Sequence, residues 1–202
     1  MNIRSYRPAD LPHLYRICLA TAAAGRDAAS LYRDPLLVGH VYMAPYAILS
    51  PDTCLVVEDG NGVCGYIVGA RDTETFESQL EIEWWPDLRR LYSAPRQQET
   101  GPEYDDLMVR LIHRPFHTPR RFSSAYPSHL HINLLPRMQG KGCGRALMTR
   151  WLGRLWDMES IGAHLAVGTA NPRAVAFYRQ YGFDEIERTG KDKRIAWFGL
   201  RR

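Results

Sequence analysis

Apolar and polar residues recur with two different periods along the chain, and these periods predict both strands and helices. Runs of β-branched and aromatic residues, or a strict alternation of apolar with polar positions, indicate strands. The predicted strands cover residues 3–6, 53–58, 63–70, 128–135, 163–167, 183–188 and 195–200. Helical spacing follows residue 10, continues with breaks over 27–49, and is found again over 74–92, 102–113, 145–158 and 172–180.

Local signals mark where several of these elements begin and end. Asp10 is the predicted N-cap of the first helix, and Asn171 is a predicted N-cap that is followed by Pro172 at the first helical position. Gly182 is well placed to end that last helix. Residues 59–62, Asp-Gly-Asn-Gly, form a tight-turn signal, so the strands on either side are expected to form a hairpin.

Residues 73–127 interrupt this regular order. They contain two of the predicted helices, which flank a polar loop at residues 96–101. A connection of this length in a compact domain is usually functional or an insertion. Its most distinctive feature is the pair Trp84-Trp85 before Pro86. Core packing is expected for both tryptophans, with the lining of a substrate cleft as the alternative.

The order of the elements predicts the fold class. Strands joined by a hairpin pair antiparallel, whereas strands joined through a helix tend to be parallel. We therefore expect one mixed sheet with helices on both faces, in the α/β (α+β) class. With 202 residues, of which 45% are hydrophobic and 24% charged, the chain has the size and composition of a single domain over residues 1–202.

Charge and composition exclude several classes of protein. The net charge of +4 is small and dispersed along the chain, which argues against a nucleic-acid partner. Residues 36–49, the longest apolar stretch, are too short to span a membrane and include His40 and Pro45. The four cysteines form no CxxC pair and no histidine cluster has zinc spacing, so no metal is expected. Because the first residues contain no apolar leader, the chain is expected to be cytoplasmic.

A glycine-rich turn, Gln-Gly-Lys-Gly-Cys-Gly at residues 139–144, separates a predicted strand from a predicted helix. A helix start presents unpaired amides and the positive end of its dipole, which together bind anions. The glycines remove the Cβ atoms that would keep a phosphate from those amides, while Lys141 and Arg145 add positive charge. The turn therefore predicts a phosphate site, most simply for a diphosphate.

The spacing of the glycines distinguishes between the known types of phosphate-binding loop. No Lys-Ser/Thr pair follows as a Walker loop requires, and the glycines do not match the dinucleotide motif GxGxxG. The spacing that remains, Gln139-x-x-Gly142-x-Gly144, resembles the acetyl-CoA loop of the GCN5-related N-acetyltransferases (GNATs), [QR]-x-x-G-x-[GA]. Downstream, residues 171–183 have the order N-P-x-A-x-x-F-Y-x-x-x-G-F and resemble the other signature of that family.

The resemblance implies a GNAT fold, with a mixed, mostly antiparallel central sheet of about seven strands and a helical insertion at about residues 73–127. It also implies an acetyl-CoA-dependent N-acetyltransferase with a ternary-complex mechanism. The acetyl group would pass directly from acetyl-CoA to an amine acceptor, either a small amine or a protein or peptide lysine. A non-catalytic acetyl-CoA-binding pseudo-acetyltransferase or interaction domain is the alternative.

Site residues follow from the same resemblance. Leu134 and Leu135 would present backbone groups to the pantetheine arm, and Asn171 would approach the pantetheine or acetyl end. Tyr178 would be the general acid that protonates the departing thiolate, with packing as its alternative role. The diphosphate would be held by the turn and the helix start, namely Gln139, Gly140, Lys141, Gly142, Cys143, Gly144 and Arg145.

The general base is not identified by the sequence. Family members often place Glu or His on the active-site face of the central strand, at positions that match Ser128 and Leu130 here, and neither residue can serve. By alternation His129 and His131 lie on the other face and are expected to be packed or hydrogen-bonded. Glutamates 81 and 83 of the insertion, or water, are the alternatives. The mechanism needs no nucleophile, so Cys143 is interpreted as a small loop residue.

A narrower resemblance is carried by residues 126–131, by Trp85-Pro86 and by the hairpin around residues 57–66. These segments are similar to the acetyltransferase-like domain attached to animal O-GlcNAcases, and the chain is similar to bacterial relatives of that domain. The glycine-rich loop is degenerate in the animal domain and intact here, which favours coenzyme binding by this chain. The sequence does not determine the oligomeric state, although Trp84, Trp85 and the carboxy-terminal strand could form the interface of a homodimer.

Overall fold

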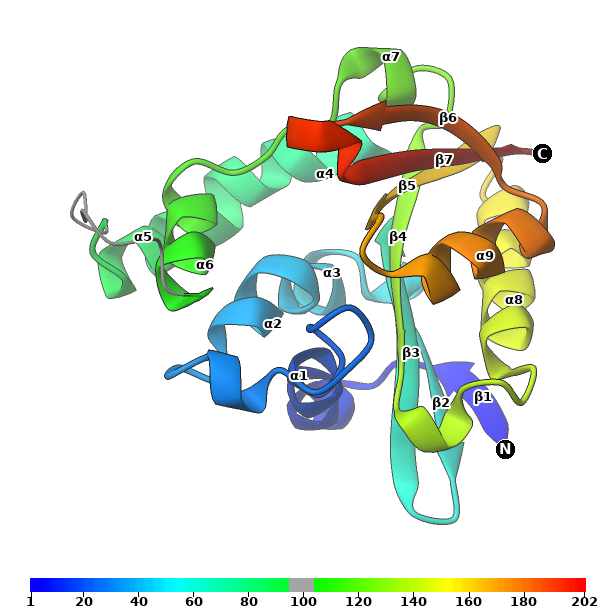
Figure 1. Cartoon of the computed structure of the whole chain (residues 1–202), viewed down its shortest axis with the longest axis horizontal. Coiled ribbons are helices and arrows are strands. Elements are labelled where there is room, and N and C mark those ends of the chain that lie inside the picture. The colour runs from blue at the N-terminus through cyan, green and yellow to red at the C-terminus, as the bar shows by residue number, and fades with distance from the viewer. Residues whose placement is uncertain (95–103) are drawn as a thin grey trace.

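The computed structural model describes residues 1–94 and 104–202. Within these residues, seven strands form one sheet in the order β1-β2-β3-β4-β5-β7-β6 (Figure 1). The strands are β1 Asn2–Ser5, β2 Leu55–Asp59, β3 Gly62–Ala70, β4 Ser128–Leu134, β5 Gly162–Gly168, β6 Asp184–Thr189 and β7 Ile195–Arg201. Every neighbouring pair is antiparallel except β4 and β5, which are parallel. The predicted mixed, mostly antiparallel sheet is therefore confirmed.

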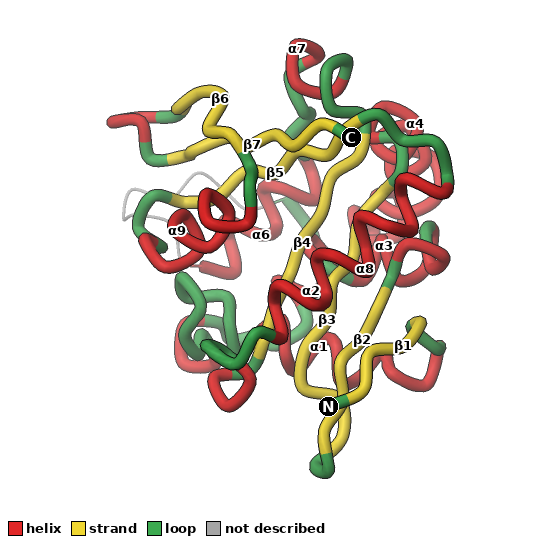
Figure 2. The backbone as a smooth tube through the Cα atoms, turned by 90° about the vertical axis from the view of Figure 1, so that its right-hand side faces the viewer, coloured by secondary structure: helices red, strands yellow, loops and turns green. Residues whose placement is uncertain are grey.

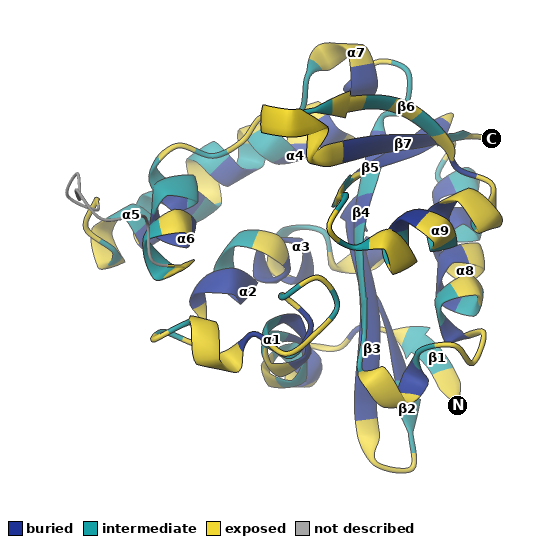
Figure 3. Ribbon diagram, in the orientation of Figure 1, coloured by how far each residue is buried: buried dark blue, intermediate teal, exposed yellow. Residues whose placement is uncertain are grey.

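Helices cover both faces of the sheet (Figure 2). The helices are α1 Leu11–Leu19, α2 Leu37–Tyr42, α3 Ala44–Leu49, α4 Thr73–Gln79, α5 Trp85–Leu91, α6 Tyr104–His113, α7 Arg120–Ser123, α8 Cys143–Asp157 and α9 Pro172–Tyr181. Helices α1–α6 share one hydrophobic core with the sheet, and α8 and α9 share a second core on its other face. Because helices lie on both sides, β3 is buried along nearly its whole length (Figure 3).

The pairing of β4 with β5 is very short. Only Ser128 with Ala163 and His129 with His164 are paired, and beyond them the two strands diverge (Figure 2). On its other side β4 pairs with β3 along its length, and the amide of Leu135 still donates to the carbonyl of Cys64 at 2.9 Å. Because hydrogen bonds alternate along an antiparallel ladder, the backbone groups of residues 130, 132 and 134 point toward the gap between β4 and β5.

The insertion is helical, as predicted, but its first helix is interrupted. The predicted helix over 74–92 consists of α4, a π-helical turn at Leu80–Trp84, and α5. The predicted loop at 96–101 and the expected start of the next helix at residue 102 lie outside the described residues. Both tryptophans pack as expected: Trp85 is only 4% exposed, and Trp84 Nε1 donates to the carbonyl of His40 at 3.0 Å.

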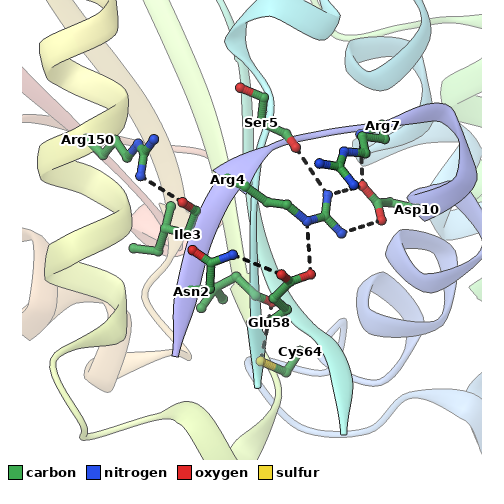
Figure 4. A network of polar contacts seen from close by, with 10 residues as sticks. Asn2, Ile3, Arg4, Ser5, Arg7, Asp10, Glu58, Cys64 and Arg150 are labelled. Atoms are coloured by element: carbon green, nitrogen blue, oxygen red, sulfur yellow. Dashed lines mark hydrogen bonds and ion pairs between the residues drawn. The ribbon is translucent and has the colours of Figure 1, made fainter. Parts of the chain in front are cut away.

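Asp10 precedes α1 as predicted, but its side chain does not cap that helix. Its carboxylate accepts hydrogen bonds from Arg4 at 2.7 and 2.8 Å and from the amide of Arg7 at 2.8 Å (Figure 4). The bonds from Arg4 hold the pKa of the Asp10 carboxyl below its usual value. Arg4 also donates to Glu58 on β2, so this network joins the first two strands to the start of α1.

Candidate active site

A cleft of about 750 Å³ lies beside the part of β4 that has left β5. Its walls are the end of β4, the glycine-rich turn with the start of α8, helix α9, and the segment that follows α1. Eight of the eleven predicted site residues line it: Leu134, Gln139, Gly140, Gly142, Gly144, Arg145, Asn171 and Tyr178. The sequence therefore identified most of one wall of the cleft.

The glycine-rich turn has the backbone conformation that its glycines allow. Gly140 and Gly142 have φ angles of 73° and 78°, in the left-handed region where glycine is favoured. Helix α8 begins at Cys143, two residues before the predicted start, and its first turn closes with the bond from Ala146 N to Gly142 O at 3.0 Å. The amides of residues 143–145 precede that bond and have no partner within the helix, so they and the helix dipole can hold an anion.

Gly144 is required by close packing rather than by its φ angle. A Cβ atom at this position would lie 3.3 Å from the ring of Phe177 on α9. The absence of a side chain thus lets α9 approach the start of α8 closely.

Gln139 makes two hydrogen bonds with different partners. Its Nε2 donates to the carbonyl of Leu134 at 2.8 Å, and its Oε1 accepts from Nη1 of Arg173 at 2.6 Å. The side chain therefore connects the end of β4 with the beginning of α9.

Three arginines, Arg26, Arg145 and Arg173, line the cleft. Arg145 donates to the carbonyl of Gln180 at 3.1 Å and lies over the ring of Tyr181, 5.2 Å from its centroid. Among the described residues, no carboxylate forms an ion pair with any of the three. The cleft consequently carries positive charge that suits a phosphorylated ligand.

Tyr178 lies on α9 with its ring in the second core, against Phe177, Phe183 and Phe198. It is 8% exposed, lines the cleft, and its hydroxyl makes no hydrogen bond to any described residue. Burial raises the pKa of this phenol, so it is protonated at neutral pH. The residue thus offers the cleft an unengaged O–H group.

Asn171 caps α9 as predicted, because its Oδ1 accepts from the amide of Ala174 at 3.1 Å. Its Nδ2 faces the segment after α1, 3.7 Å from where a Cβ on Gly25 would lie. Asn171 therefore lies where two walls of the cleft meet.

Three predicted site residues do not line the cleft. The amide of Leu135 is engaged by Cys64, and Lys141 is exposed on the turn. Cys143 is only 2% exposed and its Sγ lies 3.0 Å from Sδ of Met1. Cys143 is thus the first residue of α8 and not the loop residue expected from the sequence, and its buried thiol lies against Met1.

The two β4 positions that the family pattern places in the active site are not accessible. Ser128 is fully buried and Leu130 is 3% exposed, in contact with the core under α8, so nothing can approach either side chain. His129 is on the other face and is packed, as expected, with its ring nitrogens 2.8 Å from Tyr46 Oη and from Thr73 Oγ1. Burial lowers the pKa of His129 well below its ordinary value.

The remaining candidates for a base lie away from the cleft. His131 lies between the rings of Tyr42 and Tyr46, where burial lowers its pKa to about 4. Glu81 is paired with Arg89 at 2.9 Å, and Glu83 is exposed. Of the described residues that line the cleft, only Asp27 carries a carboxylate and none is a histidine.

Sequence reasoning missed the wall formed by residues 21–27. Thr21 accepts a hydrogen bond from Asn133 of β4 at 2.6 Å, which holds this segment against the strand. No local motif marks the segment, because its role depends on tertiary contact. Arg173 and Phe177 were also missed, although both lie inside the recognised motif of residues 171–183.

The observed groups fit a coenzyme with a diphosphate, since free amides, positively charged side chains and a free strand edge lie in one cleft. In the described part of the chain, no group of three or more His, Cys, Asp or Glu side chains is arranged to hold a metal ion. None of the described helices is long and apolar enough to cross a membrane.

Comparison with known proteins agrees with this geometry. Residues 124–201 match the family model described as an acetyltransferase (GNAT) domain. The crystal structure of SsHAT superimposes with a TM-score of 0.88 and 38% identity, covering 99% of this chain and 97% of that one. Protein O-GlcNAcase of Rattus norvegicus and that of Mus musculus are each 27% identical over 185 residues, or 92% of this chain. This chain spans about a fifth of the length of those two relatives.

More distant structures share the fold alone. One is yncA, a putative acetyltransferase from Salmonella typhimurium that was solved with its cofactor acetyl-CoA. It has a TM-score of 0.57 and 16% identity, and the match covers 99% of this chain and 92% of yncA. The family model, the similarity to SsHAT and the seven-stranded sheet together show that this chain belongs to the GNAT acetyltransferase family.

Proposed function

We propose that this chain is an acetyl-CoA-dependent N-acetyltransferase that transfers the acetyl group directly to an amine. One observation carries the proposal: the glycine-rich turn, the free edge of β4 and the unengaged hydroxyl of Tyr178 all border the same cleft. These are the groups needed to bind a diphosphate, to hold an extended amide-containing arm, and to supply a proton.

The chain's own residues would divide these tasks by position. The amides at the start of α8 would hold the diphosphate, and the backbone of Ile132 with the amide of Leu134 would hydrogen-bond the amides of the pantetheine arm. When bound, acetyl-CoA supplies an acetyl group activated as a thioester. Binding along this edge would bring the thioester toward the point where β4 and β5 separate.

Tyr178 would hold a proton at its Oη, available to the thiolate that leaves when the amine attacks. A free thiol has a pKa near 8.5, below that of the buried phenol, so the proton would pass to the departing sulfur only through a direct hydrogen bond, while the carbon–sulfur bond breaks. The hydroxyl of Tyr178 makes no hydrogen bond to the described residues, and this supports the role. Packing of the ring alone would not require the hydroxyl to be free.

Replacing Tyr178 by Phe tests the role directly. The variant keeps the ring and its packing but removes the proton, so kcat should fall by about a hundredfold while the affinity for acetyl-CoA changes little. Thiol release from acetyl-CoA measures turnover, and calorimetry measures affinity. Unchanged turnover would reduce Tyr178 to a packing residue.

The acceptor remains open between a small amine and a protein or peptide lysine. A thiol-release assay against a panel of amines, aminoglycosides, peptide N-termini and lysine peptides is the experiment that tests the proposed function. Amine-dependent release of thiol supports the transferase. A chain that binds CoA but releases no thiol with any acceptor supports the alternative of a non-catalytic acetyl-CoA-binding domain.

One observation favours that alternative. The described lining of the cleft contains no histidine, and its single carboxylate, Asp27, accepts a hydrogen bond from the amide of Ala29 at 3.0 Å. A transferase with this lining would accept an amine that is already deprotonated, or pass the proton to water. Turnover that rises with pH in parallel with the free-amine fraction of the acceptor would agree with an enzyme of this kind.

A further inference from the structure

Arg173 extends from the start of α9 to the glycine-rich turn. It is the second residue of α9 and lines the cleft. Its Nη1 donates to Oε1 of Gln139 at 2.6 Å, and its Nη2 lies 3.6 Å from the place of a Cβ on Gly140. The guanidinium group is therefore held over the first glycine of the turn.

Gln139 has both ends of its amide occupied within the protein. The Nε2 group donates to the Leu134 carbonyl at 2.8 Å, while Oε1 accepts from Arg173. The oxygen faces a cation and the nitrogen faces the end of β4, so neither end is directed at an anion. The positive charge next to Gln139 is the guanidinium of Arg173, which lines the cleft.

The charge of Arg173 has no acidic partner among the described residues. Arg179, on the same helix, provides a contrast because its guanidinium pairs with Glu185. The guanidinium of Arg173 has no carboxylate partner and is fixed by one hydrogen bond to a neutral amide, close to the free amides of the helix start. Its remaining N–H groups can therefore form two parallel hydrogen bonds with a phosphate.

We propose that Arg173, reaching from α9 to the glycine-rich turn, binds the diphosphate of the coenzyme beside the amides of the helix start. Gln139, which the motif suggested as a diphosphate-binding residue, is instead a positioning residue that acts through Arg173. This assignment rests on the proposed function in one respect, namely that the ligand is coenzyme A.

Calorimetric titration with CoA and with 3′-dephospho-CoA tests the role of Arg173. Both ligands carry the diphosphate, so Arg173→Gln should weaken both by the same factor, about tenfold or more. Arg173→Lys should recover part of the loss, because charge is kept while the paired geometry is not. Arg179→Gln removes the same charge from the same helix and should leave both affinities at the wild-type value.

Other outcomes overturn the assignment in distinguishable ways. Wild-type affinity of Arg173→Gln for both ligands would show that the guanidinium does not contact the coenzyme. A loss confined to CoA would assign Arg173 to the 3′-phosphate instead. Absence of CoA binding by the wild-type chain would refute the proposed function itself. Thermal unfolding of each ligand-free variant identifies any that fails to fold.

A double-substitution cycle tests the positioning role of Gln139. Gln139→Ala should weaken CoA in the wild-type background and have no further effect when combined with Arg173→Gln. Equal losses in both backgrounds would show that Gln139 acts independently of Arg173. If the alanine variant does not fold, Gln139→Leu, which keeps more of the side-chain volume, takes its place in the same cycle.

Discussion

Because Gly142 has no side chain, the space in front of the helix-start amides stays open. Its φ angle is 78°, and a Cβ atom at this position would meet nothing within 4 Å. The residue immediately precedes α8 and its carbonyl accepts the first bond of that helix. A larger side chain here would have room, but it would extend into the space in front of the helix-start amides.

Replacing Gly142 by Glu should therefore abolish binding without unfolding the chain. The carboxylate would occupy the anion site and repel a diphosphate, so CoA should no longer raise the melting temperature. Gly142→Ala is the matched control: it should lower stability by about 1 kcal/mol because of the positive φ angle, yet keep most of the thermal shift. A full thermal shift with the glutamate variant would contradict a diphosphate site at this turn.

At the scale of single residues, the sequence predicts what local chemistry determines. Asn171 caps its helix and Gly182 ends it, because both depend on residues only a few positions away. Arg26 and Thr21 face the cleft only because the segment after α1 packs against β4, and no short-range signal carries that information. Arg173 was within a recognised motif, but its partner Gln139 is 34 positions away.

At the scale of elements, β3, β4 and α8 meet at a point with no spare space. A Cβ on Gly69 of β3 would lie 2.2 Å from the carbonyl oxygen of His129 and 2.5 Å from the ring of Trp151. Trp151 of α8 is fully buried, and its Nε1 donates to the carbonyl of Thr53 at 2.8 Å. The indole therefore cannot move aside without losing a buried hydrogen bond.

Gly69→Ala should consequently destabilise the fold by about 3 kcal/mol, as overpacking of a tight core does. Gly153→Ala on α8 is the control, because a Cβ there would meet nothing within 4 Å and alanine favours a helix. That control should raise stability by up to about 1 kcal/mol. Urea unfolding measures both, and a Gly69→Ala variant as stable as the parent would mean that the strands separate easily at this point.

The elements themselves were predicted with errors that have physical causes. Strand and helix periodicity located the sheet and the long helices, since amphipathic faces follow from burial on one side. The continuous helix expected over 74–92 contains a π-turn, because continuing helical spacing does not reveal a change of hydrogen-bond pattern. The expected start of α8 was two residues late because the glycines were assigned to the turn.

At the scale of the whole molecule, two of the surfaces considered for a dimer are already used within the chain. Strand β7 lies between β5 and β6 in the sheet, so its backbone hydrogen bonds are used on both sides. Trp85 is in the core. A homodimer remains a prediction, and β7 would not contribute a free backbone edge to it.

Three histidines that pack inside the protein should make the molecule sensitive to mild acid. Burial lowers the pKa of His129, His131 and His164, that of His131 to about 4, whereas an unfolded histidine titrates near 6.5. Below about pH 6.5 the unfolded chain binds more protons than the native one, so stability is complete above this pH and is lost as the pH falls. A histidine that stays neutral in the folded chain contributes at most about 1.4 kcal/mol per pH unit in this window.

Urea unfolding between about pH 7.5 and about pH 5 measures this loss. The buried carboxyl of Asp10 has a lowered pKa and affects stability only at more acidic pH, so the histidines dominate the window. His131→Asn should make the pH dependence shallower by about 1.4 kcal/mol per unit. Identical pH slopes for the variant and the parent would show that His131 is readily protonated in the folded chain.

Only two residue pairs join β4 to β5, yet the core under α8 includes side chains from the strands on both sides of this junction, among them Leu55, Ile67, Leu165 and Phe198. The angle between the two halves of the sheet is thus set by how those apolar side chains fit around α8, and much less by backbone pairing. That angle determines how wide the cleft is. Substitutions deep in this core, far from any charged group, would then tune coenzyme affinity, and related chains can differ in affinity while keeping an identical glycine-rich turn.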